Sequence, residues 1–277
     1  MRRRSARGGR LERHRKRPEH AGAWLAFMED TPMAAHTLVH EAAAVPIVTE
    51  QLSGLTGGSG FLAWLQGETL LVTVAHHATG LNSNTDVWAD WMPRLHVPMG
   101  PAPSPGQPIP VHPSPIELFE LTAEGKRVPR FRYVRPAWTP GFVADVIAVP
   151  VQDTWDWTAN VPVIDLDAID GGPSTGQSAV VWGFPVGVGD QWPSRRSVSG
   201  PTVGLSGPGP ALLLIDMQVT VGFSGAPVFV DDGRFVGMAI GESNDGKSHA
   251  QLLTPGIIRM AAPEPGGLLV PGSFQNF

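Results

Sequence analysis

The sequence predicts an all-β protein built from many short strands, and three observations favour this class. The 277 residues include 33 glycines and 28 prolines, a high content of turn-forming residues. Apolar residues occur mainly in short runs that Gly, Pro, Ser or Asp separate. These runs fall into two successive groups without a repeat of fixed period, which predicts two antiparallel barrels or sandwiches with a cleft between them.

The first group of strands follows a lead-in over residues 34–50, which reads as a short helix or an extended segment. Strands are predicted at Phe61–Leu65 and Thr69–Val74, because a tight turn separates these two apolar runs. The prolines of residues 100–115 remove backbone donors, so this segment is predicted to be a long surface loop. The apolar run Phe142–Val151 predicts the last strand of the group.

The second group begins after a linker near residue 160. The expected division is a basic tail at residues 1–33, a first barrel at residues 34–160 and a second barrel at residues 161–277. Proline is tolerated in a first helical turn, so residues 255–262, which open with Pro255, predict a short C-terminal helix. The strands of this group are predicted at residues 178–184, 211–220, 226–230, 234–240 and 250–254.

The N-terminal tail is strongly basic. Residues 1–20 hold nine of the 20 lysines and arginines but only two of the 25 acidic residues, so the rest of the chain is acidic. A basic arm could bind nucleic acid or an anionic membrane. It could also be a solvated tail, or an extension upstream of a start at Met28 or Met33. Because an acidic body repels nucleic acid, we do not expect nucleic acid as the partner.

The segment after the tail does not read as a secretory signal, because Glu29 and Asp30 interrupt its apolar run. No apolar run approaches the roughly 18 residues that a membrane span requires. The chain contains no cysteine, so it can form neither disulfides nor thiolate metal sites. We therefore expect a cytoplasmic protein without a membrane span.

A serine between two glycines, in the stretch GFSGAP, is the candidate nucleophile. Serine becomes a good nucleophile when a neighbouring base takes its proton. Gly222 and Gly225 allow backbone conformations that are closed to other residues, so the amides of Gly222 and Ser224 could face a developing oxyanion. The alternative is an ordinary β-turn with Ser224 exposed on the surface.

The candidate base is one of two adjacent histidines, His76 and His77, at the end of an apolar strand. A strand end is rigid on one side and open on the other, which suits a catalytic imidazole, although a structural role is the alternative. A metal site is disfavoured because adjacent residues on a strand point to opposite faces. No other His, Asp or Glu stands nearby at a ligand spacing, and neither a metal nor an organic cofactor is expected.

Asp145 is the candidate group that orients the base. It stands within the apolar run Phe142–Val149, where an unpaired buried charge would be costly. A carboxylate in such a place usually has a specific partner, and the imidazolium of a catalytic histidine would be one. The alternative is an aspartate on the exposed face of a strand.

Together these stretches resemble the trypsin-like serine peptidases. LLVTVAHHATG is similar to the histidine strand of that family, with the pattern T-A-A-H, and so assigns the base to His76. ADVIAV is similar to the D-I-A strand and assigns the orienting carboxylate to Asp145. GFSGAPVF resembles G-x-S-G-x-P and assigns the nucleophile to Ser224. The order His, Asp, Ser is that of the family, although the first separation is long and residues 100–115 account for much of it.

The stretches GGSGFLAW, WGFPVG and GRFVGMAIGES extend the likeness over residues 55–262, with most similarity to the bacterial HtrA-like and glutamyl-endopeptidase-like branches and without a PDZ domain. The resemblance implies two antiparallel six-stranded Greek-key barrels with a cleft between them and a short C-terminal helix. It also implies a serine endopeptidase that cleaves polypeptides through an acyl-enzyme intermediate. The alternative is a catalytically silent fold that acts as a protein-binding module.

The resemblance further assigns the oxyanion hole and the substrate-binding stretch. The oxyanion hole would be formed by the backbone amides of Gly222 and Ser224. A regulatory protein partner is a further possibility. Phe223 stands where the animal branch has an acid that pairs with a new N-terminus, so activation by cleavage is not expected. The residues implied in substrate binding are Gln218, Val219, Met238, Ala239, Ile240 and Gly241.

Overall fold

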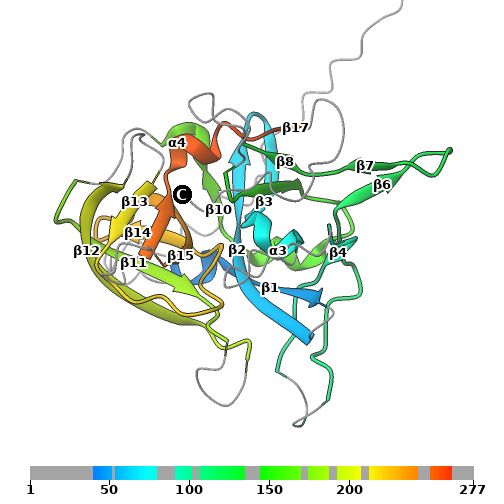
Figure 1. The fold of residues 1–277 in the computed structure, drawn as a ribbon, viewed down its shortest axis with the longest axis horizontal. Coiled ribbons are helices and arrows are strands. Elements are labelled where there is room, and N and C mark those ends of the chain that lie inside the picture. Colours follow the sequence, from blue (N-terminus) through cyan, green and yellow to red (C-terminus); the bar gives the residue numbers. More distant parts are fainter. Residues whose placement is uncertain are drawn as a thin grey trace, which may run out of the picture.

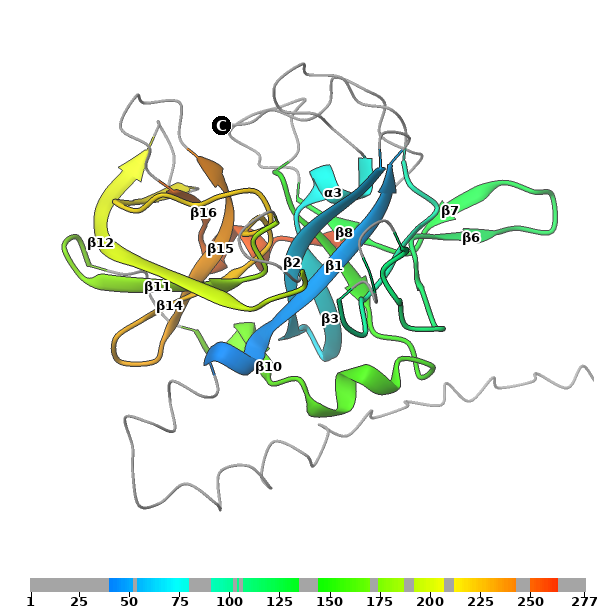
Figure 2. The ribbon, with the colours of Figure 1, turned by 90° about the horizontal axis from the view of Figure 1, so that it is seen from below.

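A computed structural model of the chain describes most of residues 40–263, and the tail predicted at residues 1–33 lies outside this part. The described residues form two β structures that pack side by side (Figures 1 and 2). The expected division of the chain at residue 160 stays a prediction. Within residues 40–263, the description omits residues 52–53, 80–90, 102–103, 105–106, 135–143, 170–173, 187–191, 207–211 and 243–249.

A seven-stranded sheet forms the first β structure. Its antiparallel path runs in the spatial order β1 (Ala44–Gln51), β2 (Gly54–Leu65), β3 (Glu68–Thr73), β9 (Ile147–Pro150), β8 (Arg132–Tyr133) and β17 (Ala262–Pro263). The seventh strand, β10 (Val163–Asp165), pairs parallel with β2. In the sequence, β17 comes after all the strands of the second β structure. The chain therefore returns to the first sheet at the end of the described residues, where β17 pairs with β8.

Short elements surround this sheet. β4 (Arg94–Leu95) pairs with β5 (Ile116–Glu117), and β6 (Phe119–Leu121) pairs with β7 (Arg127–Pro129) in a hairpin that projects from the body (Figure 1). Helix α3 (Ala75–Thr79) follows β3 directly. Two short 3-10 helices flank β10, namely η1 (Asp156–Asn160) and η2 (Leu166–Ala168).

The prediction that the first half is a closed six-stranded barrel is wrong for the part of the chain that the structure describes. Closure requires a continuous ladder of hydrogen bonds around the sheet. The β4–β5 and β6–β7 ladders form separate sheets, and β8 and β17 pair over only two residues. The prolines of residues 100–115, between β4 and β5, cannot donate ladder hydrogen bonds, which favours separate short pairs over one long strand.

The second β structure is a closed six-stranded antiparallel barrel, as expected. Its strands follow one another in the order β11 (Ser178–Gly183), β12 (Arg196–Ser206), β13 (Leu212–Ile215), β16 (Ala250–Leu253), β15 (Phe235–Glu242) and β14 (Pro227–Val230). The predicted C-terminal helix is present as α4 (Pro255–Ile258), which is shorter than expected. Strand β12 was not predicted, because serines, glycines and a proline interrupt its apolar pattern.

The core explains why β2 and β3 read as nearly continuous apolar runs. Alternate residues on a strand point to opposite faces, and both faces of this sheet are buried. Phe61 and Leu70 belong to a cluster shared with the barrel, in which the Phe61 and Phe235 ring centroids lie 5.1 Å apart. Leu62 and Leu71 pack on the opposite face. The shared cluster holds the sheet against the barrel, so that residues of β2 reach the turn before β14.

Candidate active site

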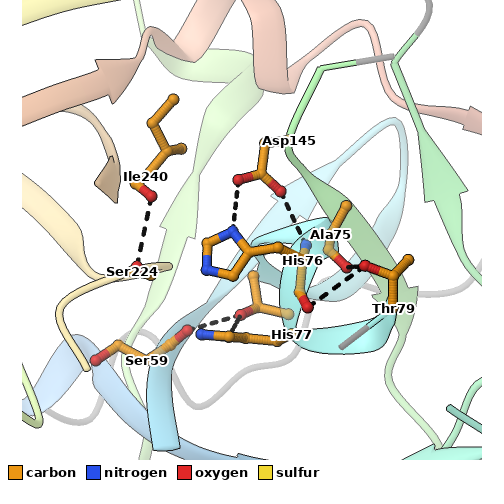
Figure 3. Close-up of polar contacts among 9 residues, drawn as sticks. Ser59, Ala75, His76, His77, Thr79, Asp145, Ser224 and Ile240 are labelled. Carbon is orange, nitrogen blue, oxygen red and sulfur yellow. Dashed lines mark hydrogen bonds and ion pairs between the residues drawn. The ribbon is translucent and has the colours of Figure 1, made fainter. Parts of the chain in front are cut away.

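His76 and Asp145 form a tightly connected pair. His76 lies in α3, and its Nδ1 is 2.6 Å from Asp145 Oδ2. The backbone N–H of His76 donates to Asp145 Oδ1 at 2.9 Å, so both carboxylate oxygens engage one residue (Figure 3). A proton on Nδ1 is therefore donated to the carboxylate, which leaves the lone pair of Nε2 as the proton acceptor.

Asp145 occupies a bend immediately before β9, whereas a strand through this position was predicted. The aspartate side chain is only 7% exposed, and the imidazole of His76 is 23% exposed. Burial makes an unpaired carboxylate costly, and the two hydrogen bonds from His76 offset that cost. The bend directs this carboxylate to His76, which comes from the helix after β3.

Ser224 comes from the other half of the molecule, in the turn that precedes β14. Its hydroxyl donates a long hydrogen bond of 3.4 Å to the carbonyl of Ile240 in β15. Figure 3 shows the second ring nitrogen of His76 on the side of the imidazole that faces Ser224. The three residues singled out by the sequence motifs thus lie in one site between the sheet and the barrel.

The carbonyl groups around Ser224 are all anchored. The Val221 carbonyl accepts from the Val186 amide at 2.8 Å, and the Phe223 carbonyl accepts from the Ala226 amide at 2.9 Å. In a trans peptide the N–H points opposite to the C=O. These two bonds therefore set the direction of the next amides in the chain, which belong to Gly222 and Ser224.

Two amides of this turn donate hydrogen bonds to described residues, and two do not. Phe223 donates to the Thr220 carbonyl at 3.2 Å, and Gly225 donates to the Ala239 carbonyl at 2.7 Å. Within the described residues, the amides of Gly222 and Ser224 donate to no protein group. They are the two amides for which the sequence motif implied an oxyanion hole.

Glycine is required on both sides of the serine. Gly222 has a φ of 103° and Gly225 a φ of 85°, a region that residues with a side chain rarely adopt. Space is also lacking, because a Cβ on Gly222 would overlap the Phe184 carbonyl and one on Gly225 would overlap the Ser59 carbonyl. The turn can therefore approach the neighbouring backbone only without side chains at these positions.

His77 has a different environment from its neighbour. It is buried, and its ring fills the space above Gly58, where a Cβ would overlap it. Its ring meets that of His76 edge to face with the centroids 4.7 Å apart, and Nδ1 is 3.3 Å from Thr73 Oγ1. Burial, and secondarily the nearby His76, lower the pKa of His77 well below its ordinary value. His77 is therefore a neutral, packed side chain.

The residues implied in substrate binding have varied surroundings. Gln218 is exposed, whereas the side chains of Val219, Met238 and Ala239 are buried in the cores. Ile240 and Gly241 lie in β15, and the Ile240 carbonyl contacts the Ser224 hydroxyl. A role of this stretch in binding substrate stays an expectation.

Motif reasoning missed Ser59 as a residue of this site. Ser59 lies in β2, is fully buried and contacts the nucleophile turn through its side chain and its backbone. The sequence signal was the serine of GGSGFLAW, a stretch that extended the family likeness without assigning this residue a role. A buried serine of this kind indicates a buried hydrogen bond. The sequence does not show the bonding partner, because that residue, Gly222, is 163 positions away.

A closed antiparallel barrel with a second β sheet packed against it agrees with the trypsin-like serine protease fold that the motifs resembled. The resemblance seen in the motifs is confirmed at this level. No helix in the described part of the chain has the length and apolar character needed to cross a bilayer.

Neither a protein-family model nor a curated protein sequence matches this chain. Solved structures do match. The serine endoprotease from Yersinia pestis is 15% identical with a TM-score of 0.47, and the match covers 80% of this chain and 62% of that protein. The active form of the Rv3671c protease from M. tuberculosis is 19% identical with a TM-score of 0.46, over 84% and 86% of the two chains. The thermostable serine protease AL20 from an extremophilic microorganism is 12% identical with a TM-score of 0.47, over 78% and 92%.

Proposed function

We propose that this protein is a serine endopeptidase that uses His76, Asp145 and Ser224. The observation that supports this function best is the double hydrogen bond between Asp145 and His76, at 2.6 and 2.9 Å. It holds the imidazole in the tautomer in which Nε2 accepts a proton, on the side of the ring that faces Ser224 (Figure 3).

In the proposed reaction, His76 Nε2 takes the proton of Ser224 as Oγ attacks the carbonyl carbon of the peptide bond. Asp145 stabilises the imidazolium that forms. The resulting oxyanion accepts hydrogen bonds from the amides of Gly222 and Ser224, which have no protein acceptor in the described part of the chain. His76 then gives the proton to the leaving amine. In the second half of the reaction, His76 takes a proton from water as the water attacks the acyl-enzyme, and it returns that proton to Ser224 Oγ as the ester bond breaks.

The Ser224 hydroxyl must turn away from Ile240 to reach His76. Its present bond of 3.4 Å is near the upper limit for an O–H donor and is correspondingly weak. Catalytic hydrogen bonds are often loose in the free enzyme and shorten when substrate binds. Rotation about the Cα–Cβ bond of Ser224 therefore requires the loss of only a weak interaction.

The implied substrate is a polypeptide, because the fold is that of proteases that cleave such chains. Strand β15 contacts Ser224 at Ile240 and continues to Glu242, and we propose that Ile240 and Gly241 bind the substrate near the scissile bond.

Purified protein should react with a fluorophosphonate probe, and Ser224→Ala should abolish this labelling and proteolysis while the melting temperature stays nearly unchanged. The hydroxyl contributes little to stability, because its single hydrogen bond is long. Intact-mass spectrometry measures the adduct. Labelling that persists in Ser224→Ala would overturn the assignment. A folded wild-type protein that is never labelled would instead favour the alternative, a catalytically silent fold that binds proteins.

A further inference from the structure

We propose that Ser59 is a positioning residue for catalysis, which fixes the turn that carries the amides of Gly222 and Ser224. The proposal rests on the proposed function, because positioning matters only if these amides bind an oxyanion. Ser59 comes from β2, in the half of the molecule opposite to Ser224, and its side chain is fully buried.

Ser59 contacts two carbonyl groups of the turn that carries Ser224. Its Oγ donates to the Gly222 carbonyl at 2.7 Å, and its backbone N–H donates to the Ser224 carbonyl at 2.8 Å. The same Oγ accepts from the Phe184 amide at 3.1 Å. The hydroxyl thereby uses its proton and one lone pair, and its orientation is determined.

These contacts restrain the peptide group that matters for an oxyanion. The Gly222–Phe223 and Ser224–Gly225 peptides flank the Phe223–Ser224 peptide, and Ser59 holds the carbonyl of each flanking peptide. A rotation of the central peptide would require changes in the torsions that the flanking carbonyls restrain. Gly222 and Gly225 give this segment unusual conformational freedom, so the turn depends on outside contacts to remain in one arrangement.

Ser59 is itself held by the strand that leads to His76. Thr73 Oγ1, at the end of β3, donates to the Ser59 carbonyl at 2.7 Å. Because that bond uses the hydroxyl proton, the 3.3 Å contact with His77 requires Nδ1–H of His77 to be the donor. A chain of buried hydrogen bonds thus runs from His77 through Thr73 and Ser59 to the turn that carries Ser224.

The test compares Ser59→Ala with Thr202→Val. Ser59→Ala leaves the Gly222 carbonyl and the Phe184 amide without a partner and keeps the backbone bond to Ser224. Thr202 on β12 is also buried, with 2% of its surface exposed, and its Oγ1 donates to the Ser174 carbonyl at 2.6 Å. Thr202→Val therefore removes a short, part-buried side-chain hydrogen bond of a buried residue from another part of the barrel.

For Ser59→Ala, we expect kcat with p-nitrophenyl acetate and the rate constant of fluorophosphonate labelling to fall by about tenfold to a hundredfold, less than the loss of a whole oxyanion donor. KM should stay within about twofold, because the turn acts on the transition state more than on the bound substrate. Thr202→Val should retain wild-type rates. Equal losses in the two variants, or wild-type rates in Ser59→Ala, would overturn the proposal.

Hydrogen exchange provides a readout that needs no activity. In Ser59→Ala, a peptide covering residues 219–226 should exchange faster than in the wild type. The amides of Phe223 and Gly225 are protected by hydrogen bonds, and these bonds should open more often when the backbone of the turn is less restrained. The same peptide should be unchanged in Thr202→Val. If the wild type never reacts with the probe, the proposed function fails. If the wild type reacts but neither exchange nor rate responds to Ser59→Ala, only the positioning role fails.

Discussion

His76 and His77 have the same side chain but different chemistry, because their surroundings differ. The imidazole of His76 is bonded on one side to Asp145 and partly open on the other. His77 is buried against Gly58 and Thr73. At the scale of single residues, function therefore depends on which of two neighbours has an accessible nitrogen, and this difference supports two predictions.

His76→Ala should reduce peptidase activity nearly as severely as Ser224→Ala, since members of one catalytic unit do not contribute additively. His77→Ala should reduce the activity of the folded protein much less. It should instead lower the free energy of unfolding by about 2–4 kcal/mol, the usual cost of truncating a large buried side chain. Active-site titration and urea denaturation measure the two quantities, and the opposite ranking of activities would show that His77 is the base.

Stability should fall as the pH is lowered through about 6.5, in part because of His77. The pKa of His77 in the folded protein is well below its ordinary value, first because of burial and then because of His76. Between the two pKa values the unfolded chain binds a proton that the folded protein does not bind, so acid favours unfolding. In His77→Gln, urea denaturation should show a smaller loss of stability between about pH 7.5 and pH 5. An unchanged loss would mean that His77 is protonated in the folded state.

The turn around Ser224 shows how an element acquires a shape that its own residues do not maintain. Every carbonyl from Val221 to Ser224 accepts a hydrogen bond, and those of Gly222 and Ser224 accept theirs from Ser59 in β2. The turn needs glycine for two reasons. The φ angles of its two glycines are positive, and the backbone of neighbouring segments lies too close for a Cβ. A pair of glycines with the same φ separates these two requirements.

Gly225→Ala and Gly67→Ala form this pair, with φ values of 85° and 84°. Gly67 has no atom within 4 Å of an added Cβ, so Gly67→Ala should cost only the strain of the left-handed conformation, about 1–2 kcal/mol. In Gly225→Ala the Cβ also overlaps the Ser59 carbonyl, so the loss should be larger and fluorophosphonate labelling should be slow. Urea denaturation and labelling rates measure both effects. Equal losses of stability in the two variants would show that the turn can shift to make room for the added Cβ without a cost in free energy.

At the scale of the whole molecule, the site depends on the packing of the sheet against the barrel, and Phe223 anchors the turn of Ser224 in the core of the barrel itself. Phe223 is 3% exposed and belongs to the barrel core with Met217 and Val219. An ammonium group brought to this place would lose its hydration without finding a carboxylate at this position. The turn is therefore held by apolar packing and by contacts from β2.

Activity should accordingly be independent of N-terminal processing. Strand β1 spans residues 44–51, so a trimmed protein must begin before it, at His40. Intact and trimmed proteins should react with the fluorophosphonate probe at equal rates. Because trimming can also remove steric blocking, the decisive variant is the trimmed protein with its new α-amine acetylated. A large gain on trimming that acetylation cancels would show that a terminal charge switches the site.

The sequence by itself determined the β class, the central strands β2, β3 and β9, five of the six barrel strands and the candidates His76, Asp145 and Ser224. These features depend on local patterns, namely short apolar runs, turn residues and motifs a few residues long. The short strands β4–β8, β10 and β17 were not predicted, because two or three residues are too few to show an alternating pattern. Strand β12 escaped this reasoning because polar residues and glycines hide its pattern. Asp145 was placed in a strand, although it occupies the bend before β9, because the apolar run continues through it.

Only the tertiary structure decided that the first half is an open sheet and that Ser59 holds the nucleophile turn. Sheet closure depends on which edges meet, and the hydrogen bond from Ser59 to Gly222 joins residues 163 positions apart. A strand pattern shows that a residue is buried but not which distant group it meets. That partner is chosen by the packing of the sheet against the barrel, through the cluster that Phe61 and Phe235 share.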